Sequence, residues 1–194
     1  MMKRRILVVG VIGIGVAVLV GACGLFKVRD SEPPISGPPV PWQIPVEPHL
    51  VLVNLKATTD MKSITNFDRE FTTDPAYTFR FDPFQASGAD TVWDRNRDIS
   101  ALTTLFQGKG PATLTWTPTD SGSAGADRFY RNLGYRLVIQ RSTSDTSHAV
   151  IVGNCNLYMT LQGTNWMVRR WEDLELGDNV HTWGWARLNT GLPH

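Results

Sequence analysis

A long run of alternating side chains, residues 149–161, constrains the fold of this chain more than any other feature. Every second position from Ala149 to Leu161 is small or apolar, whereas Asn154, Asn156 and Thr160 lie at positions between them. Successive side chains of a β-strand point to opposite faces of its sheet. The pattern therefore predicts a long strand that buries one face.

Segments on both sides repeat this period of two. Residues 112–116 alternate apolar side chains with threonines, and residues 135–139 alternate Tyr, Leu and Ile with Arg and Val. The Ser, Gly, Asp and Ala residues of 118–127 predict a flexible hairpin connection, and the Gly-Thr-Asn of 163–165 predicts a turn. This spacing predicts a sheet of four or five long antiparallel strands.

The stretch 166–188 contains four of the chain's seven tryptophans, interleaved with arginines and an aspartate. We interpret it as the closing strand pair of the sheet, with residues 182–188 as the second strand. The alternation of the first strand is expected to place one pair of side chains on each face: Trp166 with Val168, and Arg169 with Trp171.

Two interactions are expected within this closing stretch. Trp171 and Trp183 are expected to pack against the inner face of the sheet, because aromatic side chains bury large apolar areas. Asp173 is expected to pair with Arg187 or Arg170. The stretch is then part of the fold, although tryptophans beside arginines are also common at recognition sites.

Helical periodicity precedes the strands. Residues 50–61 place apolar side chains on one side at helical spacing. A second, shorter helix is expected to be capped by Ser63 and stopped by residues 74–75, Asp-Pro. Tyr77, Phe79 and Phe81 then alternate with polar residues, which predicts a short strand with one buried face.

A third helix is expected before the long strands. Thr91 and Asp94 have the spacing of a capping box, and the helix presents an apolar face, Ile99, Leu102, Leu105 and Phe106. Residues 108–110, Gly-Lys-Gly, end this helix and lack the remainder of a phosphate-binding loop. Helices followed by antiparallel strands predict an α+β domain in which the sheet curls over three N-terminal helices.

The N-terminus has the features of an export signal. Lys3, Arg4 and Arg5 form a basic region, residues 6–20 form an apolar run, and small residues precede Cys23. This combination predicts a signal peptide, residues 1–22, that ends in a lipobox. Cys23 is then the residue that carries a diacylglycerol group.

A simple membrane anchor is the alternative reading of the same segment. Residues 6–26 contain no charge, and about 20 apolar residues suffice to span a bilayer. In both readings the basic end stays inside and the remainder of the chain is exported. We expect a protein of the bacterial cell envelope that faces the periplasm or the exterior, on the outer membrane in a Gram-negative cell.

Residues 23–47 are expected to form a tether between the lipidated cysteine and the domain. Seven prolines lie between residues 27 and 49, and proline fixes φ and removes an N–H donor, so the segment is expected to be extended. Trp42, Ile44 and Val46 alternate, and this part is expected to lie back along the domain as a short strand. Residues 48–192 then form one domain of ordinary size.

Charge and cysteine content exclude several function classes. Loss of the signal takes Lys and Arg from 19 to 16 against 18 Asp and Glu, so the mature chain carries about −2 and has no basic footprint for nucleic acid. With Cys23 lipidated, Cys155 is the only cysteine left, and we expect it to be a small buried residue. The four histidines lack metal-binding spacing, so neither a metal nor another cofactor is expected.

Five short sequences carry a family resemblance, and they are spread over residues 48–188. They are Val51-Leu52-Val53-Asn54-Leu55, Phe79-Arg80-Phe81-Asp82-Pro83, Trp93-Asp94-Arg95, Trp166-x-Val168-x-x-Trp171-x-Asp173 and Thr182-Trp183-Gly184-x-x-Arg187. Together with the order of helices and strands, they resemble the nuclear transport factor 2-like superfamily, which includes ketosteroid isomerase and the SnoaL-like cyclases. Within it they are similar to a group of uncharacterised bacterial lipoproteins.

This resemblance implies a cone-shaped domain with an apolar pocket between the helices and a strongly bent antiparallel sheet. Catalytic members resembling ketosteroid isomerase need a carboxylate base and a tyrosine or protonated-acid donor in that pocket. No residue here is assigned such a catalytic role. The candidates for pocket or structural positions are Tyr77, Asp82, Tyr135, His148, Tyr158, Trp171, Asp173, His181, Trp183 and Arg187.

Two function classes follow from these observations. The first is a non-catalytic lipoprotein domain that binds a small apolar ligand or another envelope protein, and the second is a SnoaL-like or isomerase-like enzyme acting on a hydrophobic carbonyl compound. An acid and a donor that converge within about 3 Å of one interior point favour the enzyme. An interior filled by side chains favours a partner surface. The resemblance also allows for a homodimer, because some members of the superfamily dimerise.

Overall fold

The computed structural model describes residues 42–73, 76–84, 91–117, 121–124, 126–174, 176–177, 181–189 and 192. The chain divides into two units, Met1–Pro38 and Pro39–His194, and every described residue lies in the second unit. The expected signal peptide, Cys23 and most of the expected tether lie outside the described residues, as do Asp74 and Pro75. Within the described part of the chain, no helix has both the length and the apolar character needed to cross a membrane.

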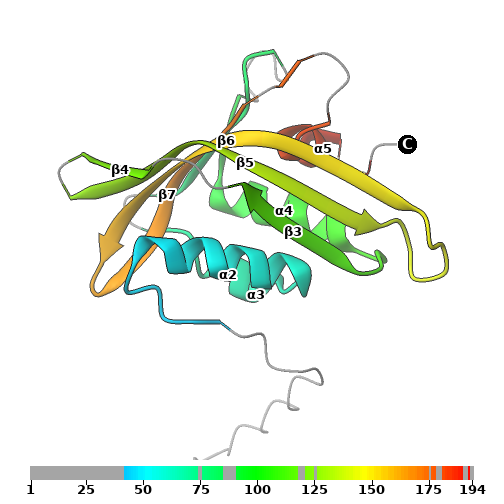
Figure 1. Ribbon diagram of the computed structural model, residues 1–194, viewed down its shortest axis with the longest axis horizontal. Coiled ribbons are helices and arrows are strands. Elements are labelled where there is room, and N and C mark those ends of the chain that lie inside the picture. Colours follow the sequence, from blue (N-terminus) through cyan, green and yellow to red (C-terminus); the bar gives the residue numbers. More distant parts are fainter. Residues whose placement is uncertain are drawn as a thin grey trace, which may run out of the picture. The chain divides into compact units, whose positions relative to one another are not determined.

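Among the described residues, seven strands form one sheet, in the order β2-β1-β7-β6-β5-β3, with β4 paired to β5. Their bounds are β1 Thr78–Arg80, β2 Val92–Asp94, β3 Ala112–Thr117, β4 Ser121–Ala124, β5 Asp127–Gln140, β6 His148–Gln162 and β7 Asn165–Leu174. Neighbouring strands are antiparallel except β1 and β7, which are parallel. The sheet curls over the helices (Figure 1), which confirms the expected α+β class.

Two bulges interrupt the long strands where the sheet bends. The register of β5 against β6 shifts between Tyr130 and Leu133, and there Asn132 has a φ of 52°. The backbone N–H of Asn132 donates to the side chain of Asn156 at 2.9 Å, and Asn154 donates to the Asn132 side chain at 2.7 Å. The Asn156 side chain thus satisfies the backbone N–H of Asn132 at the bulge, and bulges of this kind bend a strand.

The second bulge changes which side chains of β7 face inward. Tyr158 pairs with Arg170 and Met159 pairs with Val168, so Arg169 is the extra residue. Val168 and Trp171 are both fully buried. The expectation that these two side chains lie on opposite faces is therefore wrong, because an extra residue reverses the alternation.

Three helices cover the concave side of the sheet (Figure 1): α2 Pro48–Asp60, α3 Ile64–Asp68 and α4 Arg95–Phe106. Val51 and Leu55 of α2, Phe67 of α3, and Leu102 and Leu105 of α4 are fully buried in one core with the inner face of the sheet. The three N-terminal helices are therefore confirmed.

The helix boundaries differ from the sequence predictions in detail. Ser63 precedes α3 but makes no side-chain capping bond, and α3 ends at Asp68, before the expected stop. Phe71 instead forms a parallel bridge to Val168. The third helix starts after Asp94, whose carboxylate accepts the backbone N–H of Arg97 at 2.8 Å. The expected capping box is wrong, because the residues before Asp94 form strand β2.

Two segments have a secondary structure that differs from the prediction. Ser121–Ala124 form strand β4 inside the expected flexible connection. Residues 182–188, expected to be a strand, form most of helix α5, Trp183–Asn189. Thr182 accepts the backbone N–H of Trp185 at 3.2 Å, so a threonine at the N-cap position begins a helix here. The closing stretch is therefore one strand and one helix.

The segment before α2 lies along the domain through polar contacts, and no strand forms there. Ile44 and Val46 are exposed, so the strand prediction for this segment is wrong. The side chain of Asn54 accepts from the backbone of Gln43 at 2.9 Å and donates back to it at 2.7 Å. The indole N–H of Trp42 donates to the buried carboxylate of Glu70.

Glu70 makes the stability of this arrangement depend on pH. Burial raises the pKa of its carboxyl from 4.5 to about 7, although hydrogen bonds from Trp42 and Asn54 and the charge of Arg69 act in the opposite direction. A raised carboxyl pKa means that the folded state holds the proton more tightly. Stability is therefore expected to fall as pH rises from about 4.5 to about 7, by about 3 kcal/mol from this group alone.

The variant Glu70→Gln is expected to lose this part of the pH dependence, because the amide does not ionise and its oxygen still accepts from Trp42. Urea unfolding at several pH values between 5 and 8 measures the effect. Glu47→Gln is the control, since the side chain of Glu47 is 65% exposed. A Glu70→Gln variant that retains the full wild-type decline would contradict the interpretation.

Candidate functional site

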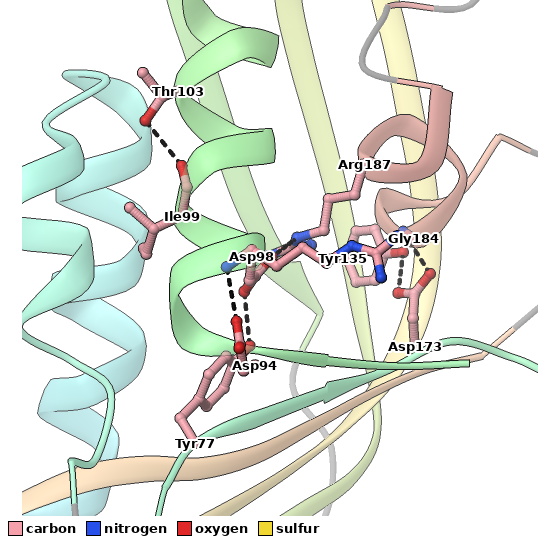
Figure 2. A network of polar contacts seen from close by, with 10 residues as sticks. Tyr77, Asp94, Asp98, Ile99, Thr103, Tyr135, Asp173, Gly184 and Arg187 are labelled. Atoms are coloured by element: carbon pink, nitrogen blue, oxygen red, sulfur yellow. Dashed lines mark hydrogen bonds and ion pairs between the residues drawn. The ribbon is translucent and has the colours of Figure 1, made fainter. Parts of the chain in front are cut away.

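Two buried carboxylates on the inner side of the sheet form the polar centre of the domain, and both contact α5 (Figure 2). Asp173 lies on β7 and Asp98 lies on the first turn of α4. Both residues, together with Arg187 of α5, are at most 1% exposed. Ionised groups at such positions need specific partners, because loss of hydration costs several kcal/mol for each charge.

Asp173 binds the beginning of α5. One of its oxygens accepts the hydroxyl of Tyr135 at 2.6 Å, and the other accepts the backbone N–H of Gly184 at 2.7 Å. The Tyr135 oxygen in turn accepts the backbone N–H of Trp183 at 2.8 Å. The hydroxyl of Thr182 also bonds to Asp173. The oxygens of Asp173 and Tyr135 thus both accept hydrogen bonds from other groups of the chain.

A glycine on β6 gives Tyr135 the room to reach Asp173. Tyr135 on β5 pairs directly with Gly153 on β6. A Cβ atom added at Gly153 would lie 2.2 Å from the Tyr135 hydroxyl oxygen, closer than any real contact. The absence of a side chain at this position therefore lets the tyrosine ring lie across β6 and extend to β7.

Asp98 binds Arg187 and Tyr77. The Nε of Arg187 donates to one oxygen of Asp98, and the Tyr77 hydroxyl donates to the other at 2.9 Å. Figure 2 shows the Arg187 side chain reaching from α5 to α4, where Asp98 lies. This ion pair joins two elements that are 89 residues apart in the sequence.

Aromatic rings surround the guanidinium group of Arg187. Its central carbon lies 4.1 Å from the centre of the Phe79 ring, 5.1 Å from that of Trp171 and 5.0 Å from that of Trp183. Such contacts favour a cation in a desolvated site. Only Nε has a hydrogen-bond partner, and Nη1 and Nη2 are buried without one among the described residues.

Burial sets the protonation of the groups in this centre. Loss of hydration raises the pKa of Asp98 and of Asp173, while their bonded donors and the charge of Arg187 oppose the shift. The pKa values of Tyr77 and Tyr135 are raised well above the usual range for the same reason, and each has a carboxylate beside it. Both phenols therefore keep their protons and act as donors near neutral pH.

An open surface pocket of about 360 Å³ lies beside the Asp98 and Arg187 pair, between α4, α5 and strand β2. Its apolar lining is Trp93, Ala101 and Leu188, and its polar lining is Arg97, Ser100, Thr104 and Arg187. This volume is at the lower end of the range for small-molecule sites. Tyr135 and Asp173 are not among the lining residues.

The structure brings six of the predicted residues into the centre and leaves four outside it. The six are Tyr77, Tyr135, Trp171, Asp173, Trp183 and Arg187, and Trp171 and Trp183 pack on the inner face as expected. The four outside are Asp82, His148, Tyr158 and His181.

Each of the four outer residues has a local role. Asp82 accepts the backbone N–H of Phe84 at 3.0 Å in a turn, and His148 is exposed at the start of β6. The Tyr158 ring lies under the guanidinium of Arg170 at 3.9 Å. The ring of His181 lies 4.1 Å from that of Trp185.

The expected ion pair of Asp173 with Arg187 or Arg170 is wrong. Arg187 pairs with Asp98, and Arg170 pairs with Glu172 at 3.0 Å. Because residues 183–189 are helical, the Arg187 side chain projects toward α4, and the backbone at Gly184 faces Asp173 instead.

Sequence reasoning missed Asp98. A signal was present, because Asp98 shares a helix face with Leu102 and Leu105 at positions i, i+4 and i+7. A charged residue on an otherwise apolar helix face indicates either an interruption of the apolar pattern or a buried partner of opposite charge. The cation of opposite charge lies 89 residues away, and its position depends on the helix at 183–189.

Cys155 is buried and forms no disulfide, as expected for a small core residue. Burial and the nearby Asp173 charge raise the pKa of its thiol well above the usual value, so it is not a thiolate. Among the described residues, no three His, Cys, Asp or Glu side chains come close enough together to hold a metal ion.

The fold is shared with solved bacterial proteins of low sequence identity. A nuclear transport factor 2-like superfamily protein from Salmonella enterica serovar Typhimurium has 11% identity over 66% of this chain and 90% of its own, with a TM-score of 0.52. A protein of Novosphingobium aromaticivorans, provisionally described as a scytalone dehydratase, has 8% identity over 69% of this chain and 88% of its own, with a TM-score of 0.54.

A protein of unknown function from Mycobacterium tuberculosis has 12% identity over 73% of this chain and 82% of its own, with a TM-score of 0.51. No protein-family model matches the sequence, and no curated protein sequence matches it. At these identities the likeness shows the fold, and the roles of side chains follow from the geometry of this chain.

The variant Asp173→Asn tests the hydrogen bonds at the start of α5. An asparagine has the same shape, but one acceptor oxygen becomes an NH2 donor that faces either Tyr135 or the Gly184 N–H. We expect a loss of about 1–3 kcal/mol of stability, because one buried donor is left without an acceptor. The shift of the urea midpoint at constant m-value measures it.

Glu172→Gln is the matched control, since it makes the same change at the neighbouring position of β7. Glu172 has a partly exposed side chain and pairs with Arg170. A loss below about 1 kcal/mol is expected there. Equal effects of the two substitutions would contradict the role given to Asp173.

Proposed function

We propose that this chain, whose domain has the nuclear transport factor 2-like fold, is a lipid-anchored protein of the bacterial cell envelope that binds a ligand or a partner without catalysing a reaction. Support for the anchor comes from the basic, apolar and small residues that end at Cys23. Support for a non-catalytic role comes from the interior of the domain.

The occupied acid and phenol carry the proposal that the domain does not catalyse a reaction. A carboxylate base must be able to reach a substrate proton, and a phenol donor must be able to reach a substrate oxygen. Here the Asp173 oxygens accept Tyr135 and Gly184, and the Tyr135 oxygen accepts Trp183. Helix α5 therefore takes the place that a substrate would need.

A second candidate function is an enzyme acting on a hydrophobic carbonyl compound. The observation that favours it is the Tyr135 hydroxyl 2.6 Å from the Asp173 carboxylate, inside the curve of the sheet. A donor beside an acid in an apolar interior is suited to enolisation. For this chemistry α5 would have to leave Asp173, breaking the contacts of Trp183 and Gly184.

Lipidation is tested on the protein recovered from bacterial membranes. We expect the mature chain to begin at an acylated Cys23 by mass spectrometry, and we expect Cys23→Ser to keep the unprocessed signal. An intact wild-type chain with an unmodified Met1 would contradict the anchor.

Catalysis is tested with a hydrophobic ketone, because the two candidate functions make opposite predictions about its proton exchange. In heavy water, β-tetralone exchanges the protons next to its carbonyl, and proton NMR follows the rate. We expect the wild-type protein to leave this rate at the buffer value. Acceleration that disappears in Asp173→Asn but survives in Glu172→Gln would favour the enzyme instead.

A further inference from the structure

A patch of exposed apolar side chains lies at the end of the domain where the described chain begins. Ile44, Val46 and Leu161 are 60%, 55% and 48% exposed, and they are three of the eight large apolar side chains that are exposed in the described part of the chain. A single exposed apolar side chain needs no explanation, whereas a cluster of them indicates an interaction surface.

Hydrogen bonding and strand pairing bring these side chains together from two parts of the sequence. The backbone N–H of Trp166 donates to the carbonyl of Pro45 at 2.7 Å, and Pro45 lies between Ile44 and Val46. Leu161 pairs with Trp166 across the β6–β7 hairpin. Figure 1 shows the start of α2 beside this hairpin. We call the four side chains of Ile44, Val46, Leu161 and Trp166 the apolar edge.

Two pairs of tryptophan and arginine give this end of the domain an amphipathic character. The guanidinium carbon of Arg128 lies 5.4 Å from the centre of the Trp166 ring, and that of Arg69 lies 4.7 Å from the centre of the Trp42 ring. Tryptophan is enriched at membrane interfaces, where one side of its ring is apolar and the other is wet. Arginine can bury its aliphatic stem there while its charge stays among the headgroups.

The acidic groups near the apolar edge have partners within the chain. The carboxylate of Glu47 lies 3.1 Å from Nδ1 of His49, and that of Asp127 pairs with Arg169 at 2.9 Å. The hairpin turn, residues 162–165, is Gln-Gly-Thr-Asn and carries no charge. The pairing of both carboxylates limits their repulsion of lipid phosphates.

The place of the apolar edge in the chain indicates the membrane as its partner. Trp42 is the first described residue, and in the proposed lipoprotein the lipid-bearing Cys23 precedes it by 19 residues. A linker of this length makes contact between the domain and the bilayer an intramolecular event. A patch too small to bind a free membrane therefore suffices once the chain is anchored.

We propose that the apolar edge docks the domain onto the headgroup region of the membrane that holds the lipid anchor. Ile44, Val46 and Leu161 enter the boundary between headgroups and acyl chains, and Trp166 and Arg128 lie at the level of the phosphates. The inference rests on the lipid anchor of the proposed function and adds the surface that meets the bilayer. A docked domain presents one fixed face to its ligand or partner.

Two matched cysteine variants place a probe at the two ends of β6. Thr164→Cys lies in the β6–β7 turn beside the apolar edge, and Thr146→Cys lies in the β5–β6 turn at the opposite end of the sheet (Figure 1). Both threonines are exposed, whereas Cys155 is buried and the pKa of its thiol is raised. In the lipidated protein a thiol reagent therefore modifies only the introduced cysteine.

The probe reports whether its site meets the acyl chains. The full-length protein, labelled with a nitrobenzoxadiazole dye, is reconstituted into vesicles of phosphatidylethanolamine and phosphatidylglycerol, with or without bromine on the acyl chains. We expect brominated lipid to quench the dye in Thr164→Cys and to leave the dye in Thr146→Cys unchanged.

A double variant removes the apolar edge without touching the core. Ile44→Ser with Val46→Ser, in the Thr164→Cys background, is expected to lower the docking constant at least about tenfold and to remove most of the quenching, because less apolar area leaves water. Val92→Ser with Val150→Ser is the control, since these exposed valines lie on β2 and at the start of β6. The control is expected to keep the quenching.

Equal quenching at the two probe sites, no quenching at either, or equal effects of the two double variants would overturn the inference. Failure of the anchor gives a different result, because a free Cys23 thiol would take up the dye in the wild-type protein. That result would overturn the anchor and the docking together. A protein that floats with the vesicles and takes no dye without an introduced cysteine, but shows no quenching in Thr164→Cys, would keep the anchor and lose the docking.

Discussion

Two buried carboxylates hold helix α5 against the sheet, and the interior of the domain depends on them. Asp173 accepts the first backbone N–H groups of the helix directly and through Tyr135, and Asp98 binds Arg187 from its last turn. A buried charge without partners is far more costly than one that is paired and hydrogen-bonded. The two sites therefore fix both ends of α5, and Trp183 fills the space between α5 and the sheet against Trp171 and Phe67.

This arrangement explains why the interior of the domain is occupied by its own groups. The acid and the phenol that could serve catalysis, Asp173 and Tyr135, are saturated by backbone groups, and Gly153 provides the space that this geometry requires. A pocket lined by residues of α4, α5 and β2 lies beside α4, and neither Asp173 nor Tyr135 lines it. The Asp173 centre has its acceptors filled by the hydroxyl of Tyr135 and the backbone of α5.

The strands and the first helices could be predicted from the sequence because their patterns are local. The alternation at residues 149–161 and the apolar stripe of α4 each follow from side chains within one element. The bulge at Arg169 could not be predicted, since it inserts one residue in an alternating strand and reverses its faces. The sequence of α5 predicts a strand because the segment is short and rich in tryptophan. The pairing of Asp98 with Arg187 could not be predicted, since the position of Arg187 depends on that helix.

Hydrogen exchange at the backbone amides of Trp183 and Gly184 tests the central claim most directly. Both amides donate to buried acceptors, so their exchange should be as slow as that of the core amides of β6, which open only when the domain unfolds. Exchange of these two amides at the rate of an open chain, while β6 stays protected, would contradict the account. It would mean that α5 leaves Asp173 readily and that the interior is accessible.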